Sequence, residues 1–293
     1  MKERVLVGLI GANIQGSLSP ALHEDAFAAA GITGHYHLMD LDRLPGRRLD
    51  DLLSAARIAG FAGVNITYPC KEAALTLVNA LSPEAREIGA INTVTFDRHG
   101  WTTGYNTDRI GFRNSFEETL GRPAVEGRTA LLLGAGGAGR AAAFALLELG
   151  AECLLVHDKD SARSQDLATS LVTQFKRPCS RAAADIMAAL PQVAGVVNAT
   201  PVGMLGIPGT PVPVEQLRPG HWVVDVIYTP LATELIKAAR ENGARVLGGA
   251  GMCVHQAAEA FRLFTGVAPD VARMRRTFMA AASVRDRRLA AIL

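Results

Sequence analysis

The strongest constraint on the fold is a glycine-rich segment near the middle of the chain. The apolar run 131–133 leads into Gly134-Ala-Gly136-Gly137-Ala-Gly139, and an alanine-rich stretch follows at once. A strand that enters a Gly-x-Gly-x-x-Gly turn and then a helix is typical of dinucleotide-binding domains. The glycines let the backbone approach a pyrophosphate, and the helix N-terminus supplies N–H donors. The segment therefore predicts a doubly wound α/β domain that binds a dinucleotide.

An acidic residue follows this motif near the spacing found in dinucleotide-binding domains. The next apolar run, 153–157, ends at Asp158, which lies 24 residues after Gly134. An acid about 20 residues after the motif usually meets the adenosine ribose hydroxyls, and its charge repels a 2'-phosphate. Asp158 therefore favours NAD over NADP. Lys159 and Arg163 leave NADP open, because either could meet a phosphate, although solvated surface charge is their commoner role.

Chain length and the pattern of apolar runs predict two α/β domains. With 293 residues, the chain exceeds the usual size of one hydrophobic core. Short apolar runs alternate with longer amphipathic segments, which predicts strand-helix-strand units and mainly parallel sheets. We expect a substrate-binding and catalytic domain over residues 1–108, a Rossmann-type NAD(P)-binding domain over residues 109–254, and a C-terminal segment, residues 255–293, that packs back on the first domain.

Turn and cap residues set the expected element boundaries. We expect a helix with Ser19 as N-cap and Pro20 in its first turn, closed by Gly31, and a second helix that opens at Ser82 with Pro83. In the first domain we expect strands at 5–10, 35–41 and 63–67, a helix at 47–59, and a hairpin of 90–96 with 101–103. In the second we expect strands at 130–133, 153–157, 195–198, 222–226 and 245–247. Helices at 254–265 and from 270 onward should close the chain.

Composition argues against several other classes of function. The formal net charge is only +2 and no long basic run occurs, so neither nucleic acid nor an anionic membrane surface is an expected partner. No stretch approaches the roughly 20 apolar residues that a membrane helix needs. The four cysteines are scattered without CxxC spacing, so we expect reduced thiols and no metal site. We expect a soluble cytoplasmic protein, monomeric or homodimeric.

Three polar clusters of the first domain follow predicted strands or precede predicted helices, where an α/β sheet collects its ligand groups. Each cluster alone has an ordinary structural explanation. Ser19 and Asp108 are good helix N-caps, and Lys71 could be a solvated lysine. Their common location instead suggests one cleft. The clusters are Ser17 with Ser19, residues 65–71, and residues 89–93 leading to 104–108.

The order of these motifs resembles the shikimate dehydrogenase family and its quinate/shikimate dehydrogenases. The resemblance rests on eight ordered motifs that run almost from end to end of the chain, with Ile66 in place of the usual valine. The motifs are Ser17-Leu-Ser19-Pro20, Asn65-Ile-Thr67-Tyr-Pro69-Cys-Lys71, Gly89-Ala-Ile-Asn92-Thr93, Asn106-Thr-Asp108-Arg-Ile-Gly111, the glycine motif, Asn198-Ala-Thr200-Pro201, Asp225-Val-Ile-Tyr228-Thr-Pro230 and Gly249-Ala-Gly251-Met-Cys-Val-His-Gln256.

The resemblance implies a role for individual residues. Lys71 and Asp108 would form a catalytic pair, in which Lys71 takes the hydroxyl proton when hydride moves to the nicotinamide. Because a free lysine is protonated at pH 7, this role requires a partly desolvated cleft or a relay through Asp108 and water. The implied substrate-binding residues are Ser17, Ser19, Thr67, Asn92, Tyr228 and Gln256. The cofactor-binding residues would be Gly134, Ala135, Gly136, Gly137, Ala138, Gly139, Asp158, Lys159, Arg163, Asn198, Thr200, Val226, Gly249 and Met252.

Departures from the family pattern favour the NAD-using quinate/shikimate branch. NADP-using members typically carry Asn-Arg-Thr where this chain has Asp158-Lys159. The runs Gly220–Tyr228 and Phe261–Gly266 are also shared with NAD-using members. The resemblance implies that the protein interconverts shikimate and 3-dehydroshikimate, in the pathway to the aromatic amino acids, and also quinate and 3-dehydroquinate. A related ring acid such as aminoshikimate is an alternative substrate.

Other functional interpretations remain open but are less favoured. A methylenetetrahydrofolate dehydrogenase has a similar two-domain plan, but its pterin site would require different motifs in the first domain. A non-catalytic nucleotide-sensing regulator could keep the fold, and the presence of Lys71 and Asp108 argues against it. His35 and His37 could suggest a metal pair, but a structural strand is the simpler interpretation. His255 is expected to have a packing or surface role.

Overall fold

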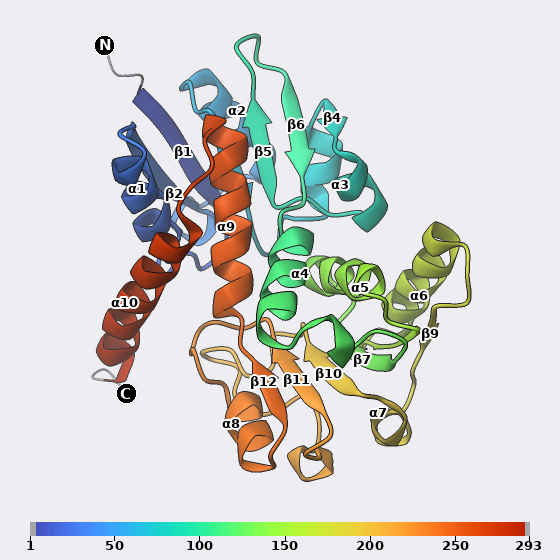
Figure 1. Ribbon diagram of the computed structural model, residues 1–293. Coiled ribbons are helices and arrows are strands. Elements are labelled where there is room, and N and C mark those ends of the chain that lie inside the picture. The colour runs from blue at the N-terminus through green and yellow to red at the C-terminus, as the bar shows by residue number, and fades with distance from the viewer. Residues whose placement is uncertain (1–3, 291–293) are drawn as a thin grey trace. The chain divides into compact units, whose positions relative to one another are not determined.

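The computed structural model describes residues 4–290, and these residues divide into two compact units (Figure 1). Unit 1 contains the described residues up to Thr107 together with those from Val254 onward, and unit 2 contains residues 108–253. Each unit has its own six-stranded sheet with helices packed against it. The predicted α/β class is confirmed.

Unit 1 is built on a mixed sheet in the order β2-β1-β3-β5-β6-β4. The three strands at one side are parallel, and β5 pairs antiparallel with both β3 and β6. The short β4 pairs parallel with β6 at the edge. The strands are β1 (Arg4–Gly11), β2 (Thr33–Asp40), β3 (Gly63–Ile66), β4 (Ala80–Leu81), β5 (Thr93–Phe96) and β6 (Thr102–Tyr105).

The helices of unit 1 come from both ends of the chain. The last helix, α10, lies beside α1, and an ion pair of 2.7 Å joins Arg273 of α10 to Asp25 of α1 (Figure 1). The Thr277 hydroxyl donates a second bond to Asp25 over 2.9 Å. The helices are α1 (Ser19–Ala29), α2 (Leu49–Ile58), α3 (Pro83–Ile88), α10 (Val271–Ala290) and the larger part of α9 (Ala250–Thr265), with 3-10 turns at Leu41–Arg43 and Ala73–Leu77.

Of the three residues predicted to cap or close helices in unit 1, two are confirmed and one is wrong. Ser82 caps α3, since its hydroxyl accepts a bond from the Ala85 N–H at 3.2 Å. Gly31 closes α1 in a left-handed conformation with φ of +68°. Ser19, however, is the first residue of α1 and not its N-cap. The preceding Ser17 hydroxyl accepts the Ser19 N–H at 3.2 Å instead.

Unit 2 contains a six-stranded parallel sheet in the order β12-β11-β10-β7-β8-β9. Counted from the first strand of the unit, this is the order 6-5-4-1-2-3 of a doubly wound dinucleotide fold, whose order reverses between β7 and β10. Loops that leave neighbouring strands in opposite directions at this point form the usual ligand crevice. The strands are β7 (Thr129–Leu133), β8 (Cys153–His157), β9 (Ser180–Ala182), β10 (Gly195–Asn198), β11 (Trp222–Asp225) and β12 (Arg245–Leu247).

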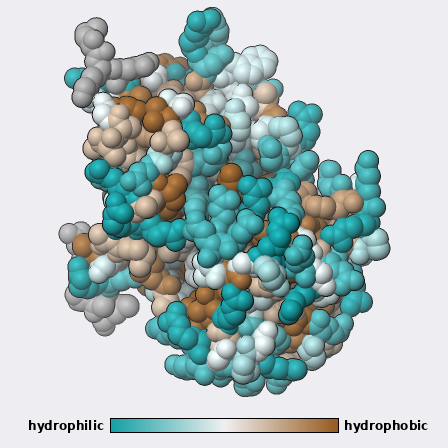
Figure 2. All heavy atoms as spheres, viewed as in Figure 1, coloured by the Kyte–Doolittle hydropathy of each residue, from teal (hydrophilic) through white to brown (hydrophobic). Residues whose placement is uncertain are grey.

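The helices of unit 2 cover its sheet, and the core between them is apolar. Leu131, Leu133 and Val196 of the central strands are at most 1% exposed and pack against Leu235. None of the helices in the described part of the chain is both long and apolar enough to cross a bilayer. The face seen in Figure 2 is mainly hydrophilic, with apolar residues in small groups. The helices are α4 (Asp108–Thr119), α5 (Gly137–Glu148), α6 (Ser161–Phe175), α7 (Ile186–Ala189) and α8 (Glu234–Glu241).

Candidate active site

The predicted glycine turn joins β7 to α5 in unit 2, and its geometry depends on two glycines. Gly134 has φ of +93°, and a Cβ there would lie 2.7 Å from the Ala199 carbonyl oxygen. A Cβ on Gly139 would lie only 1.9 Å from the Gly134 oxygen, so α5 could not approach the turn. At Gly136 a Cβ would meet only the Arg163 guanidinium, at 3.7 Å. The backbone at Gly136 is therefore accessible, as a cradle for a pyrophosphate requires.

Asp158 lies directly against this turn. Its carboxylate accepts the Ala135 N–H at 2.7 Å and the Asp160 N–H at 3.0 Å. The Gly134 N–H donates to the His157 oxygen at 2.8 Å, so the end of β8 holds the turn at two successive residues. A negative charge therefore lies at the end of the strand next to the glycine turn. This is the position from which an acid can contact an adenosine ribose.

The two nearby cations differ in their surroundings. Arg163 lies in the first turn of α6, and its guanidinium is next to Gly136. Lys159 is exposed in the turn before α6. Arg163 is therefore the cation that lies beside the glycine turn.

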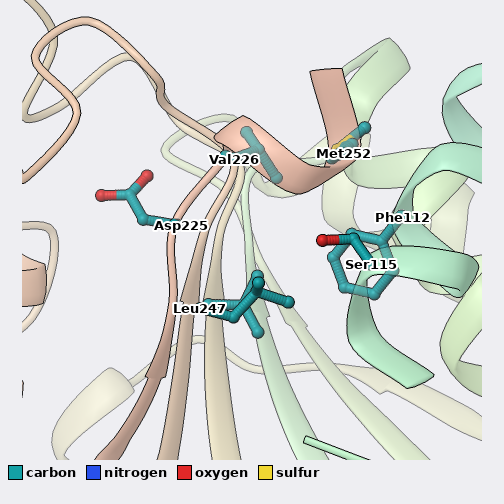
Figure 3. A pocket seen from close by; sticks show the side chains of 9 residues that line it. Phe112, Ser115, Asp225, Val226, Leu247 and Met252 are labelled. Carbon is teal, nitrogen blue, oxygen red and sulfur yellow. The ribbon is translucent and has the colours of Figure 1, made fainter. Parts of the chain in front are cut away.

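Three residues predicted to line the nicotinamide end of the cofactor site surround one small cavity in unit 2 (Figure 3). They are Val226, Gly249 and Met252, and the cavity has a volume of about 10 Å³. A Cβ on Gly249 would lie 2.2 Å from the Val226 oxygen, so this close approach of two loops requires glycine. Figure 3 also shows Phe112 and Ser115 of α4 facing Leu247 across the cavity.

Asn198 and Thr200 form a compact turn after β10. The Asn198 side-chain oxygen accepts from the Thr200 hydroxyl at 2.7 Å and from the Thr200 N–H at 3.0 Å. The Asn198 amide nitrogen donates to the Val202 oxygen at 3.0 Å and to Asp225 at 3.1 Å. This turn begins beside Gly134, because the Ala199 oxygen is the atom that a Cβ on Gly134 would strike.

Two further predicted residues belong to unit 2. Asp108 is the first residue of α4 and is 5% exposed. Tyr228 is half-buried in the loop that follows β11.

In unit 1, Asn92 and Gln256 lie in one hydrogen-bond network through Thr107. The Asn92 side-chain oxygen accepts the Thr107 N–H at 2.8 Å, and its amide donates to the Thr107 hydroxyl at 3.0 Å. The Thr107 hydroxyl also lies 3.4 Å from the Gln256 side-chain oxygen. Thr107 is buried and joins the two predicted substrate-binding residues, although the sequence assigned it no role.

The network continues to two more residues without a predicted role, Asn65 and Tyr36. The Asn65 amide donates to the Thr93 hydroxyl at 2.9 Å, and Thr93 in turn donates to Asn92 at 3.1 Å. The Tyr36 hydroxyl donates to the Asn65 side-chain oxygen at 2.8 Å. Asn65 stands in a motif that the sequence singled out, but its partner Tyr36 lies on β2, and no local pattern indicated that pairing.

The other predicted residues of unit 1 are half-buried at the ends of β1 and β3. The Ser17 and Ser19 hydroxyls are 3.2 Å apart, just after β1. Thr67 follows β3 and donates its N–H to Ile10 of β1 at 2.9 Å. Lys71 lies four residues further along, where its carbonyl accepts the Ile91 N–H at 3.0 Å. The bond between Ile91 and Lys71 ties the loop that carries Lys71 to the segment that carries Asn92.

The histidines considered for other roles have ordinary surroundings. His35 on β2 pairs with Glu24 at 2.8 Å and its side chain is largely exposed. His255 is buried on α9, with its Nε2 3.3 Å from the Arg275 guanidinium. Within residues 4–290, no group of three or more His, Cys, Asp or Glu side chains is arranged to hold a metal ion.

The first part of the chain matches a known family model. The model described as the shikimate dehydrogenase substrate binding domain matches residues 9–94, and the Shikimate 5'-dehydrogenase C-terminal domain model matches residues 249–277. The chain is also 46% identical over 281 residues to the quinate/shikimate dehydrogenase (NAD(+)) of Corynebacterium efficiens, covering 94% of this chain and 98% of that protein. The chain belongs to the shikimate dehydrogenase family.

Relatives within the shikimate dehydrogenase family differ in their named cofactor. The shikimate dehydrogenase (NADP(+)) of Streptomyces avermitilis is also 46% identical, over 93% of this chain and 94% of its own length. Among solved structures, the quinate dehydrogenase from Corynebacterium glutamicum in complex with NAD superposes with a TM-score of 0.88 at 43% identity. This match covers 95% of this chain and all of that one. The shikimate dehydrogenase family thus accounts for the fold over nearly the whole chain.

Proposed function

We propose that this protein interconverts shikimate with 3-dehydroshikimate, and quinate with 3-dehydroquinate, and that NAD is its preferred hydride acceptor. As a member of the shikimate dehydrogenase family, it is an NAD- or NADP-dependent oxidoreductase of the shikimate/quinate dehydrogenase type. The observation that carries the cofactor preference is the position of the Asp158 carboxylate beside the glycine turn.

The preference for NAD follows from charge. A 2'-phosphate would place a second negative group near Asp158, whereas a free ribose hydroxyl can donate a hydrogen bond to it. Arg163 opposes this effect, because its guanidinium lies near the turn and could pair with a phosphate. Two relatives that are equally identical to this chain are named for different cofactors, so overall similarity does not favour either one. The proposed preference for NAD therefore rests on the charges near the glycine turn.

We assign the dinucleotide to unit 2 and most contacts with the ring acid to unit 1. The cradle fits the cofactor, because Gly134 and Gly139 permit the tight turn from β7 into α5, and the backbone at Gly136 is accessible. Ala135, Gly137 and Ala138 complete the cradle, and Lys159 remains a candidate contact for the adenosine end. Asn198, Thr200, Val226, Gly249 and Met252 would surround the nicotinamide end. Ser17, Ser19, Thr67, Asn92, Tyr228 and Gln256 would hold the carboxylate and ring hydroxyls.

Acid–base work is assigned to Lys71 and Asp108. When bound, the dinucleotide would supply the acceptor for the hydride that leaves the carbinol carbon. The Lys71 amine takes the hydroxyl proton in the oxidative direction and, as an ammonium, donates it back to the forming alkoxide in reduction. The Asp108 carboxylate orients Lys71 and accepts a hydrogen bond from a ring hydroxyl. The residues of the chain thus bind the two ligands, orient them and move one proton.

A matrix of activities tests this proposal. The wild-type protein and Asp158→Asn are assayed with NAD or NADP against shikimate, quinate and aminoshikimate, by the absorbance of the reduced nicotinamide. We expect wild-type turnover with NAD on shikimate or quinate, and a fall of roughly tenfold in the NAD-to-NADP ratio of kcat/KM when the charge is removed. Asp166→Asn, which removes the same charge at an exposed position on α6, is the matched control and should change the ratio less.

Each outcome of the matrix has a clear meaning. No oxidation of any ring acid would refute the assigned activity, and turnover only of aminoshikimate would reassign the substrate. An unchanged cofactor ratio in Asp158→Asn would refute the role of that carboxylate. We also propose that the protein works in the cytoplasm, where its four free cysteines stay reduced, as a monomer or homodimer.

A further inference from the structure

Asp225 is a fully buried carboxylate to which the proposed chemistry gives no role. It is the last residue of β11 and is 0% exposed. It is one of the residues around the cavity that Val226, Gly249 and Met252 line, and Figure 3 shows its side chain pointing away from that cavity. The residue therefore lies between the proposed nicotinamide end and the interior of unit 2.

Three donors from separate segments converge on this carboxylate. The Thr233 hydroxyl donates to Asp225 at 2.7 Å, the Ile227 N–H at 3.1 Å and the Asn198 amide at 3.1 Å. Burial raises the pKa of Asp225, and these hydrogen bonds act in the opposite direction. A buried carboxylate is costly unless it is paired in this way. Asp225 thus connects the loop after β10, the loop after β11 and the start of α8.

The contact with Asn198 selects one orientation of its amide. An ionised carboxylate only accepts hydrogen bonds, so the Asn198 nitrogen must face Asp225 and its oxygen must face Thr200. With the oxygen there, both the hydroxyl and the N–H of Thr200 donate to it. A flipped amide would place two oxygens together and would leave the Thr200 donors without their acceptor.

We propose that Asp225 is a positioning residue that fixes the nicotinamide end of the dinucleotide site. Asn198 and Asp225 are direct partners in the parallel pairing of β10 with β11. Their side chains therefore join the ends of these two strands and the loops that follow, and this region carries Asn198, Thr200 and Val226. This inference rests on the proposed function for the assignment of those three residues to the nicotinamide.

The test compares two ligands that differ only in the nicotinamide. NADH and ADP-ribose share the adenosine and the pyrophosphate, so the ratio of their dissociation constants isolates the nicotinamide end. We expect Asp225→Asn to weaken NADH binding by roughly tenfold, the effect of losing one hydrogen bond to a charged group. The binding of ADP-ribose should stay nearly unchanged. Titration calorimetry on the intact protein measures both constants.

A stability control and a swapped pair separate positioning from general damage. Thr233→Ala removes one donor to Asp225 and the cap of α8 but keeps the Asp225–Asn198 pair, so we expect a lower Tm with an unchanged ligand ratio. Asn198→Asp should place two carboxylates together and weaken NADH binding. The double variant Asn198→Asp with Asp225→Asn restores a donor and an acceptor, so it should recover part of the ratio.

Three results would overturn the inference. The first is an Asp225→Asn protein whose ratio of NADH affinity to ADP-ribose affinity equals that of the wild type. The second is a Thr233→Ala protein in which this ratio falls as much as we expect for Asp225→Asn. A wild type that binds NADH no better than ADP-ribose would also refute it. Failure of the proposed function is recognised separately, because a wild type that oxidises no ring acid still reports both dissociation constants.

Discussion

At the residue scale, five buried polar residues of unit 1 bond to one another in a continuous chain. The chain runs from Tyr36 through Asn65, Thr93 and Asn92 to Thr107. Buried polar groups without partners are costly, so such a network defines one arrangement of its members. It holds the segment whose Ile91 N–H donates to the Lys71 carbonyl, which gives the proposed base a fixed support.

The role of Lys71 leads to a prediction. Lys71→Ala should lower kcat by roughly 10²- to 10⁴-fold, the usual contribution of a positioned acid or base. The affinities for dinucleotide and ring acid should change little, because other residues supply the binding contacts. Steady-state kinetics together with direct titration of each ligand measure the two effects.

The matched control for Lys71 is Lys237→Ala, at an exposed position on α8. It removes the same charge and should leave kcat unchanged. Turnover of the Lys71→Ala protein equal to that of the control would contradict the assignment.

Single residues were predictable where a local pattern carries the chemistry. Asp158 follows from its spacing after Gly134, and the structure places its carboxylate on the turn. Asp225 and Thr107 were not predicted as site residues, because their partners lie far along the chain. Asp225 pairs with Asn198, 27 residues away, and Thr107 approaches Gln256, 149 residues away. A motif shows that a residue is unusual, but only the fold shows what it contacts.

At the element scale, strands with an apolar run were predicted well, and polar, very short or glycine-containing elements were not. The bounds of β8, β10 and β12 agree with the sequence expectation. The strand β9 has the sequence Ser-Arg-Ala and β4 has only two residues, so neither shows an apolar run, and both were missed. The helix α9 begins at Ala250 and not at Val254, because Gly251 is helical where a glycine run suggested a loop. A Cβ on Gly251 would lie 2.2 Å from the Ser115 hydroxyl, so packing requires this glycine.

The junction of β7 with α5 gives a prediction at the same scale. Gly139→Ala should displace α5 from the turn, since the added methyl would overlap the Gly134 oxygen. We expect a loss of about 1–3 kcal/mol in the free energy of unfolding, as for overpacking, and weaker binding of the dinucleotide. Chemical denaturation and NADH titration measure these effects.

Gly220→Ala provides the control for Gly139→Ala within the same unit. Gly220 has an ordinary φ, and no atom lies within 4 Å of its added Cβ. Its unfolding free energy and its NADH affinity should match the wild type. Equal behaviour of the two variants would refute the steric argument.

At the scale of the whole molecule, the packing of unit 1 creates a pH dependence. His23 is fully buried among Phe27, Tyr36, Phe261 and Phe264, and burial lowers its pKa to about 3. The unfolded chain takes up a proton near its ordinary value of 6.5, whereas the folded chain does so only near 3. Stability from this group is therefore present above pH 6.5 and is lost as the pH falls, by about 1.4 kcal/mol per pH unit.

Replacement of His23 tests this linkage. His23→Phe should flatten the pH dependence of the unfolding free energy between pH 4 and pH 6.5, measured by denaturant titration at each pH. His37→Gln, at an exposed position on the neighbouring strand, should keep the wild-type slope. A slope in His23→Phe as steep as that of the wild type would assign the acid sensitivity to other groups.

The glycine turn of unit 2 has a thermodynamic consequence. The His157 carbonyl and the Asp158 carboxylate already hold its backbone by hydrogen bonds that involve no ligand. A nucleotide that arrives there has no loop to order, and ordering a chain segment is one of the larger entropic costs of association. Binding at the pyrophosphate end should therefore show a small heat-capacity change, as rigid docking does and coupled folding does not.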